Sequence, residues 1–308
     1  MNRVSTGGNY SAVLSNIMVA QQRQMDAGDR VATQKNGSNL KDYARNAEIL
    51  TSMQSVDSRL QGYMDQNARL ADKLTTQDFA LNQIAGAADA VRQTIADALA
   101  SGRGDTVMQD IQGFFANAVE GLNARYGGKY LFSGGQIDTE PVSAQVMSDL
   151  TAGPAISSFF HNDQFKVEAK IDDSTTVKTG LLAEDLGTDL LNAFKNVQTF
   201  QEGVDGPFSG VLTDNQKAFL EGQLASWDTL HSNLVNNTAR NGMVQTRVDN
   251  VQKDILNRQT SIKGMIGGIT DADMTKAASD LQQAQLAVQA AAQVFVTLKD
   301  TSLLSVLR

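Results

Sequence analysis

The chain has 308 residues, with 26 basic and 34 acidic side chains, and a net charge of −8 makes nucleic acid and anionic membrane poor candidate partners. The absence of cysteine excludes disulfides, thiolate catalysis and cysteine-ligated metals. Aromatic residues make up only 6% of the chain, a composition typical of long helices packed side by side. We therefore expect a helical protein that binds neither nucleic acid nor membrane.

The first ten residues are polar and lack the apolar segment of a signal peptide, so we expect no cleaved secretory signal. No run of about 18 apolar residues occurs, and a transmembrane helix is not predicted. A protein of this kind that leaves the cell must use another export route.

All three prolines lie between residues 141 and 207, at Pro141, Pro154 and Pro207. Proline interrupts helices, so long helices are possible on both sides of this region. The predicted fold class is mainly α with a small β-rich inserted domain. The N- and C-terminal arms are expected to form a long antiparallel helical coiled coil or bundle.

The N-terminal arm predicts a helix over residues 9–33, a break at Asn36–Asn39 and a second helix over about 40–100, which Ser38 or Asn39 could cap. Two heptad-spaced rows, with polar breaks at Asn67 and Gln77, indicate a coiled-coil seam. The rows are Met53, Leu60, Asn67, Leu74, Leu81, Ala88 and Ile95, and Val56, Tyr63, Leu70, Gln77, Ile84, Val91 and Ala98.

In the middle of the chain the spacing of apolar residues changes from a helical period to a strand-like one. Thr106 and Gln109 have the spacing of a capping box, which predicts a helix to about Tyr126. Alternation of apolar and polar residues over 164–171 predicts a half-buried strand, and Asp172–Asp173 then indicates a turn. A helix over 181–201 and a loop over 203–210 complete this region.

The returning arm begins with another capping-box spacing, Thr213 and Gln216. The glycines at 264, 267 and 268 are expected to end this helix, with Thr270 or Asp271 capping the last one. The returning helix carries two seam rows, which are Leu220, Trp227, Leu234, Asn241, Val248, Ile255 and Ile262, and Leu230, Asn237, Val244 and Val251. The last helix carries two more, which are Met274, Leu281, Val288 and Phe295, and Ala277, Ala284, Ala291 and Leu298.

The first and last helices each carry only one narrow apolar stripe. Helical stability comes mostly from tertiary packing, so we expect both terminal segments to be poorly ordered in the monomer and to fold against neighbouring subunits.

Residues that could perform chemistry are scarce. His161 and His231 are far apart in sequence and nothing brings them together. Ser133-Gly134-Gly135 is too short for a phosphate loop, because no Lys-Ser or Lys-Thr follows. We predict no catalytic, cofactor-binding or metal-binding residues. Periodicity alone leaves two interpretations open, a self-assembling filament component and an intramolecular bundle such as a secreted effector or cytosolic scaffold.

Four segments tip this balance, because together they resemble the bacterial flagellin superfamily and, within it, the hook–filament junction proteins. The start is similar to the Arg-Ile-Ser-Thr of those proteins, and residues 128–142 resemble their Gly-Arg-Tyr-Leu-Phe-Ser-Gly hinge. The chain departs from the family at Thr33-Gln34-Lys35, where Ser-Ser-Gly is common. The four segments are Arg3–Thr6, Asp29–Ala47, Gly128–Val142 and Asp280–Arg308.

The resemblance implies a non-enzymatic junction adaptor that links the hook to the flagellin filament. Its implied domains are an inner helical domain from 1–40 and 270–308, a rod from 41–128 and 180–269, and an outward-projecting β-rich domain from 129–179. Its implied place is outside the cell, reached through the flagellar type III export channel. Its implied partners are the hook-side junction protein (hook-associated protein 1), flagellin, copies of itself in a ring and an export chaperone.

Three sets of residues follow from the rows and the hinge motif. The predicted assembly interface is Leu14, Ile17, Leu281, Val288, Phe295 and Leu298. The predicted rod seam is Leu60, Leu70, Leu74, Leu81, Trp227, Leu230, Leu234 and Val248, in which Trp227 and Leu230 with Leu70 and Leu74 are singled out as seam candidates. The predicted hinge to the outer domain is Tyr130, Phe132, Gly134, Gly135 and Pro141. A minor flagellin that forms the filament itself is the alternative within the superfamily.

Overall fold

The computed structural model describes residues 3–153 and 155–306, and the side chains of 11–153 and 155–299. The described residues form seven α-helices and two small antiparallel sheets, which confirms the predicted fold class, mainly α with a small β part. The chain divides into two compact units. Unit 1 comprises Met1–Arg59 and Asn257–Arg308, and unit 2 comprises Leu60–Leu256.

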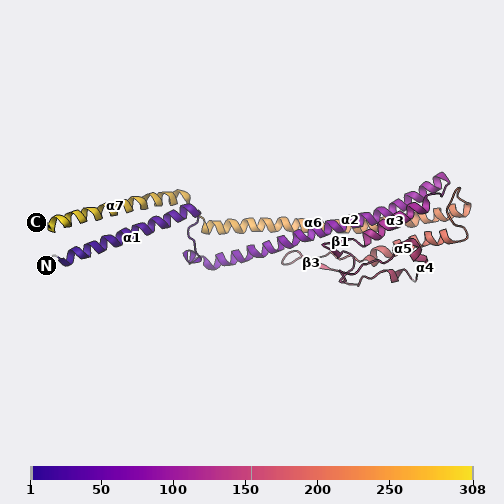
Figure 1. Ribbon diagram of the computed structural model, residues 1–308, viewed down its shortest axis with the longest axis horizontal. Helices are drawn as coiled ribbons and strands as arrows, with labels where there is room; N and C mark the ends of the chain where they lie inside the picture. The colour runs from indigo at the N-terminus through magenta and orange to yellow at the C-terminus, as the bar shows by residue number, and fades with distance from the viewer. Residues whose placement is uncertain (1–2, 154, 307–308) are drawn as a thin grey trace. The chain divides into compact units, whose positions relative to one another are not determined.

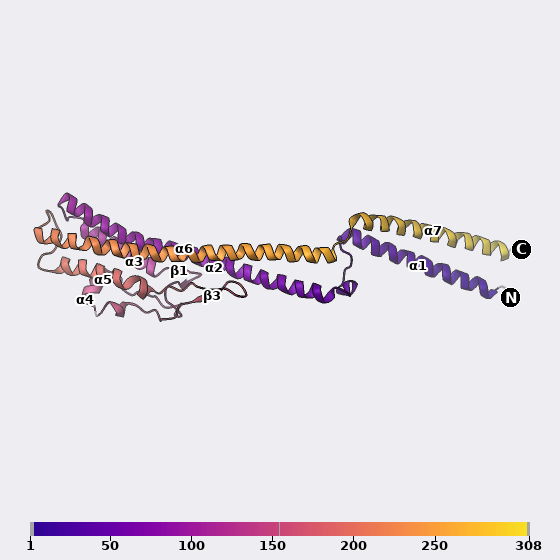
Figure 2. The ribbon, with the colours of Figure 1, turned by 180° about the vertical axis from the view of Figure 1, so that it is seen from behind.

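Unit 1 contains the two terminal helices, α1 (Arg3–Thr33) and α7 (Met274–Val306), which lie side by side (Figures 1 and 2). The predicted end of the first helix at residue 33 is confirmed, but α1 starts six residues earlier than residue 9, because Gly7 and Gly8 do not interrupt it. The predicted cap of the last helix was wrong. Asp273 Oδ1 accepts the backbone N–H groups of Thr275 (2.9 Å) and Lys276 (3.2 Å) at the start of α7.

The two longest helices, α2 (Ala47–Ser101) and α6 (Asp214–Thr270), both reach into unit 1. We call them the rod helices. The predicted start of α2 at about residue 40 was wrong, because a short 3₁₀ turn, η1 (Leu40–Tyr43), comes first, with the backbone N–H of Asn39 donating to Asp42 Oδ2 at 2.9 Å. The predicted end of α6 at its three glycines was also wrong. Glycine within a helix costs about 1 kcal/mol and does not by itself end it.

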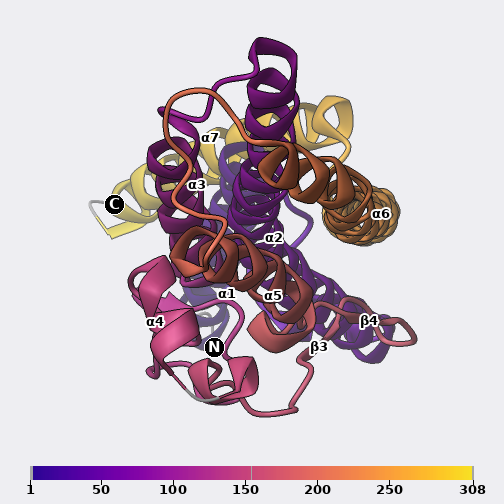
Figure 3. The same ribbon diagram turned by 90° about the vertical axis from the view of Figure 1, so that its right-hand side faces the viewer.

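In unit 2 the rod helices carry α3 (Val107–Leu122) and α5 (Ala183–Glu202), and Figure 3 shows the short α4 (Met147–Ala152) beside α5. The α5 helix and the loop after it match the prediction. The capping box at Thr213 is confirmed, since its N–H donates to Gln216 Oε1 (3.1 Å) and its Oγ1 accepts the Gln216 N–H (3.3 Å). The capping box at Thr106 was wrong, because Thr106 has no side-chain cap bond.

The predicted continuation of α3 to Tyr126 was wrong as well. The helix ends at Leu122, and β1 (Arg125–Tyr126) pairs with β2 (Lys129–Tyr130) in a two-residue hairpin. Gly127 and Gly128 form its turn with φ of 58° and 81°. Such a turn needs positive φ at both central residues, which glycine adopts without strain.

The second sheet pairs β3 (Glu168–Lys170) with β4 (Thr176–Lys178), so the strand predicted over 164–171 is shorter than its alternating pattern. Phe165 is exposed and lies outside β3. The predicted turn at Asp172 is confirmed, because Asp172 Oδ1 accepts the N–H groups of Ser174 and Thr175, both at 2.6 Å. A 3₁₀ turn, η2 (Ile156–Phe159), lies between α4 and β3.

The core of unit 2 contains the large aromatic side chains. The Phe194 ring lies edge-on to Phe115 (centroids 5.2 Å apart) and to Trp227 (4.9 Å), and all three are buried. Aromatic pairs favour this arrangement. The core joins α2, α3, α5 and α6 into one body.

Candidate assembly interfaces

The helices α1 and α7 pair through small side chains. Ala20 and Ala27 of α1 and Ala277 and Ala284 of α7 are buried. Leu298 of the predicted interface continues the heptad row of Ala277 and Ala284, whereas Leu281, Val288 and Phe295 belong to the companion row. All four are half-buried, as is Ile17 of α1. Alanines allow close approach of two helices but contribute little buried area. The pairing is therefore a thin seam.

Large apolar side chains remain exposed outside this seam. They include Leu14 of the predicted interface, which is 50% exposed. The others are Met18, Val19 and Met25 on α1 and Met274, Leu286, Val294 and Val296 on α7. Residues 281–298 of α7 carry no charged side chain at all. An uncharged helix with apolar residues on the face away from its partner is typical of a surface that a further chain covers.

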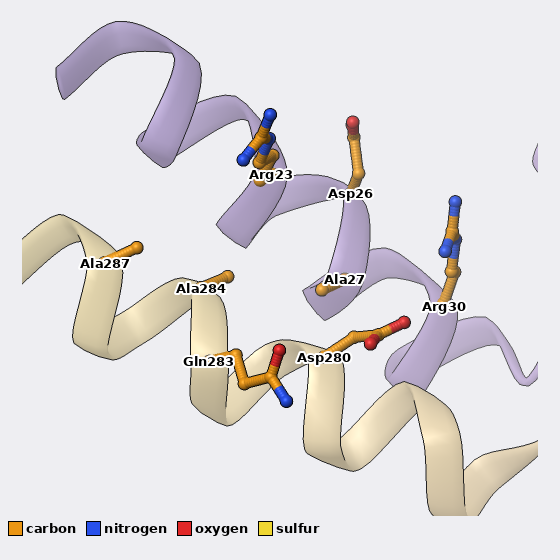
Figure 4. Close-up of a pocket in the computed structure, with 8 residues that line it drawn as sticks. All are labelled: Arg23, Asp26, Ala27, Arg30, Asp280, Gln283, Ala284 and Ala287. Carbon is orange, nitrogen blue, oxygen red and sulfur yellow. The ribbon is translucent and has the colours of Figure 1, made fainter. Parts of the chain in front are cut away.

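A groove of about 390 Å³ runs between α1 and α7 (Figure 4). Arg23, Asp26 and Arg30 line it from α1, and Asp280 extends toward them from α7. Ala27, Ala284 and Ala287 form its floor together with Gln283. Asp26 Oδ1 accepts a hydrogen bond from Gln22 on its own helix (2.8 Å). Both signs of charge are thus displayed beside the apolar seam, which would favour a partner of mixed charge over a strongly acidic or basic one.

All eight predicted rod-seam residues are buried, with Leu74, Leu81, Trp227 and Val248 at most 1% exposed. They do not form one continuous contact. Trp227, Leu230, Leu234 and Leu81 belong to the aromatic core, whereas Leu70, Leu74 and Val248 form a smaller cluster with Ile171 and Val177 of the β3–β4 hairpin. Trp227 and Leu230 therefore lie in a different cluster from Leu70 and Leu74. The antiparallel register of the rod helices places Leu74 opposite Asn241 and Gln245, whose side-chain amides donate to its carbonyl oxygen at 3.0 and 2.9 Å.

The polar seam residues have separate partners. Gln77 Nε2 donates to Asn241 Oδ1 at 3.2 Å across the rod, and both side chains are buried. Asn67 is fully buried and donates to the carbonyl oxygen of Ile171 at 2.9 Å, so it holds the β3–β4 hairpin on α2. Gln66 Nε2 donates to the carbonyl of Lys170 at 3.0 Å beside it. The polar gap at residue 67 was visible in the sequence, but the hairpin that fills it was not.

The predicted hinge is firmly held in unit 2. Phe132 is fully buried and its carbonyl oxygen accepts the N–H of Ala183 at 2.9 Å. Tyr130 is buried too, with the Arg125 guanidinium 4.1 Å above its ring centroid and hydrogen-bonded to its hydroxyl. The carbonyl oxygen of Pro141 accepts the N–H of His161 at 2.9 Å. These contacts fix the start of the inserted segment against α5.

Gly134 and Gly135 meet Asp163, which sequence reasoning did not single out. Asp163 Oδ1 accepts the N–H groups of Gly135 and Phe165, both at 2.9 Å, and these bonds lower the pKa of its carboxyl group, the Gly135 bond most strongly. Gly134 has a φ of 69°, and a Cβ on it would lie 2.1 Å from Asp163 Oδ1. Only glycine fits this close approach.

Among the residues described, no helix is long and apolar enough to cross a bilayer. In the same part of the chain no three His, Cys, Asp or Glu side chains gather as a metal site would require.

Two parts of the chain match sequence models of known families. Residues 4–136 match the bacterial flagellin N-terminal helical region, and residues 224–307 match the bacterial flagellin C-terminal helical region. The chain belongs to the bacterial flagellin family, which makes it a structural component of the flagellum that assembles with other flagellar components. No curated protein sequence matches the chain significantly.

Solved structures share the fold. A candidate flagellar hook-associated protein from Vibrio parahaemolyticus superposes with a TM-score of 0.61 at 14% identity, covering 75% of this chain and 100% of that one. Bacillus cereus FlgL superposes with a TM-score of 0.54 at 16% identity, covering 71% of this chain and 99% of that one.

Proposed function

We propose that this chain is the adaptor between the flagellar hook and the flagellin filament. The observation that carries the proposal is the fold likeness to hook-associated proteins along essentially their whole length, in a chain whose two ends match flagellin helical regions. On this proposal its work is mechanical and not enzymatic. It matches two helical lattices that differ in stiffness.

The partners follow from that position. Copies of the chain form a ring between the hook-side junction protein and the first flagellin subunits, and an export chaperone holds the C-terminal helix before secretion. The chain travels through the flagellar export channel without a cleaved signal peptide. The exposed apolar residues of α1 and α7, and the uncharged stretch of α7, support unit 1 as the surface where copies meet.

The decisive experiment is electron microscopy of flagella from a deletion strain. Bare hooks with flagellin shed into the medium are expected. Unaffected motility would instead point to an effector or scaffold outside the flagellum and would overturn the proposal.

A single substitution tests the surface. Val294 is 52% exposed on α7, so Val294→Asp should leave the α1–α7 pair intact and yet stop filament growth beyond the hook, because a buried unpaired charge at a subunit contact is strongly unfavourable. Val288 is a poorer probe, since its half-buried side chain belongs to the seam. The matched control is Val204→Asp in the fully exposed loop after α5, which should leave normal filaments. Normal filaments with Val294→Asp would contradict this interface.

A minor flagellin that builds the filament itself is the second candidate. The ending Leu303-Leu304-Ser305-Val306-Leu307-Arg308 favours it, because this ending is similar to that of flagellins. Purified chain that polymerises alone into long filaments would support this candidate. Full or merely shortened filaments in the deletion strain would do the same.

A further inference from the structure

The two linkers that join the terminal helices to the rod helices pair with each other. Lys35 and Asp271 form an isolated antiparallel β-bridge within unit 1. The Asn36 N–H donates to the carbonyl of Thr270 at 2.8 Å, and the Ala272 N–H donates to the carbonyl of Gln34 at 2.9 Å. The bridge therefore fixes residues 34–36 against residues 270–272. The two bridged residues, Lys35 and Asp271, are 236 positions apart along the chain.

Side chains reinforce the same pairing. Lys35 Nζ lies 2.7 Å from Asp271 Oδ1 and 3.3 Å from Thr270 Oγ1. Asn36 Nδ2 donates to the carbonyl of Asp271 at 2.8 Å. The Tyr43 hydroxyl donates to the carbonyl of Gly37 (2.8 Å) and accepts the Gly37 N–H (3.0 Å), which ties η1 to the first linker.

The first linker adopts a conformation that an ordinary loop would avoid. Gln34 has a φ of 59°, in the left-handed region that non-glycine residues seldom occupy. A left-handed residue just after a helix reverses the chain direction, and here it comes directly after α1 ends at Thr33. The strained residue and the ion-paired Lys35 both lie in Thr33-Gln34-Lys35, where the sequence departs from the usual flagellin pattern.

We propose that residues 34–36 and 270–272 form a register clasp, latched by Lys35 and Asp271, that fixes how α1 pairs with α7. The clasp lies one residue after α1 and two residues before α7. Without the clasp, pairing of α1 with α7 closes a loop made of the whole chain between the two helices. With the clasp formed, only a residue or two separate each helix from the fixed point, which raises the effective concentration of one helix for the other. The thin alanine seam cannot define its register by shape alone, because its small side chains interlock weakly.

Cysteine cross-linking tests the pairing, and the cysteine-free chain offers a clean background. Residues 35 and 271 are a non-hydrogen-bonded antiparallel pair, for which the Cα separation is about 4.5 Å, within the range that a disulfide spans. We expect mild oxidation of isolated flagella to form an intramolecular cross-link in Lys35→Cys/Asp271→Cys. The control Thr33→Cys/Asp271→Cys, displaced by two residues, should stay reduced. No cross-link, or equal cross-linking of both variants, would overturn the clasp.

The latch is tested separately by charge reversal in isolated flagella, where the terminal helices are expected to be ordered. Lys35→Glu should speed hydrogen exchange of the Asn36 and Ala272 amides two- to fivefold, roughly the effect of one exposed ion pair. Lys35→Glu/Asp271→Lys should restore the original rates. Unchanged exchange in the single variant, or no rescue in the double variant, would contradict the latch. Neither measurement depends on the junction role, because both read the chain's own pairing.

Discussion

Units 1 and 2 are both built from long helices, but they bury very different side chains. In unit 2, Phe115, Phe132, Phe194 and Trp227 are at most 1% exposed. In the described side chains of unit 1, the buried apolar residues are Leu50 and four alanines. Burial stabilises roughly in proportion to apolar area, so unit 2 has a core of its own and unit 1 has little more than a seam. We therefore expect unit 1 to depend on neighbouring chains for its stability.

Charge divides the same way. Unit 1 has 12 basic and 9 acidic residues, whereas unit 2 has 14 basic and 25 acidic ones. The units therefore have net charges of +3 and −11, which add to the −8 of the chain. Like-charged acidic units repel one another, and such repulsion keeps proteins apart in solution. The near-neutral unit 1 is the better surface for contact between copies.

The largest effect is expected in the aromatic core. Phe194→Ala removes the ring between Phe115 and Trp227 and should lower the free energy of unfolding of unit 2 by about 3–5 kcal/mol. Trp227 is the only tryptophan, so its fluorescence during urea unfolding reports this unit alone. A loss below 1 kcal/mol would mean that the core of unit 2 is not its main source of stability.

The next prediction compares two glycines to separate the cost of backbone strain from the cost of a steric clash with a neighbouring side chain. Gly134→Ala and Gly210→Ala both place a side chain at positive φ, but only the first meets a neighbour, Asp163. Gly210→Ala should cost about 1–2 kcal/mol from strain. Gly134→Ala should cost more, about 2–4 kcal/mol, because it also displaces the Asp163 hydrogen bonds. Equal losses in urea unfolding would show that Asp163 moves aside freely.

A smaller effect is expected at the polar contact within the rod. Asn241→Leu leaves the buried Gln77 amide without its partner and should cost about 1–3 kcal/mol. Gln77→Leu/Asn241→Leu removes both polar groups and should recover most of that loss, as measured by Trp227 fluorescence. A double variant as unstable as the single one would contradict this explanation, because the Gln77–Asn241 hydrogen bond would then stabilise the rod by more than satisfying two buried amides.

The smallest effect concerns pH. The Asp163 carboxyl has a lowered pKa, first through its bond from the Gly135 N–H and then from Phe165. Its contribution to stability is therefore complete above the ordinary aspartate pKa and is lost as pH falls through the lowered folded-state value. Asp163→Asn should flatten this part of the acid-stability curve. An identical curve for both proteins would exclude Asp163 as a source of the pH dependence.

The sequence predicts the long helices and the seam well, because heptad spacing extends over many turns and local competition is weak. It fails where tertiary contacts decide. Asn67 was visible only as a polar break in the seam, and the structure shows that the hairpin carbonyl of Ile171 occupies it. The glycines near the end of α6 predicted that the helix ends there, but the helix continues to Thr270. Its end is held by contacts of Thr270 and Asp271 with Lys35 and Asn36. The contact of Asp163 with the hinge gave no local signal, since Gly135 lies 28 residues away.

Hydrogen exchange of the free chain and of isolated flagella, resolved by segment, tests the central difference most directly. Unit 2 should be protected in both samples, whereas α1 and α7 should exchange rapidly in the free chain and slowly in the flagellum. Full protection of both terminal helices in the free chain would contradict the account, because unit 1 would then be stable without its neighbours.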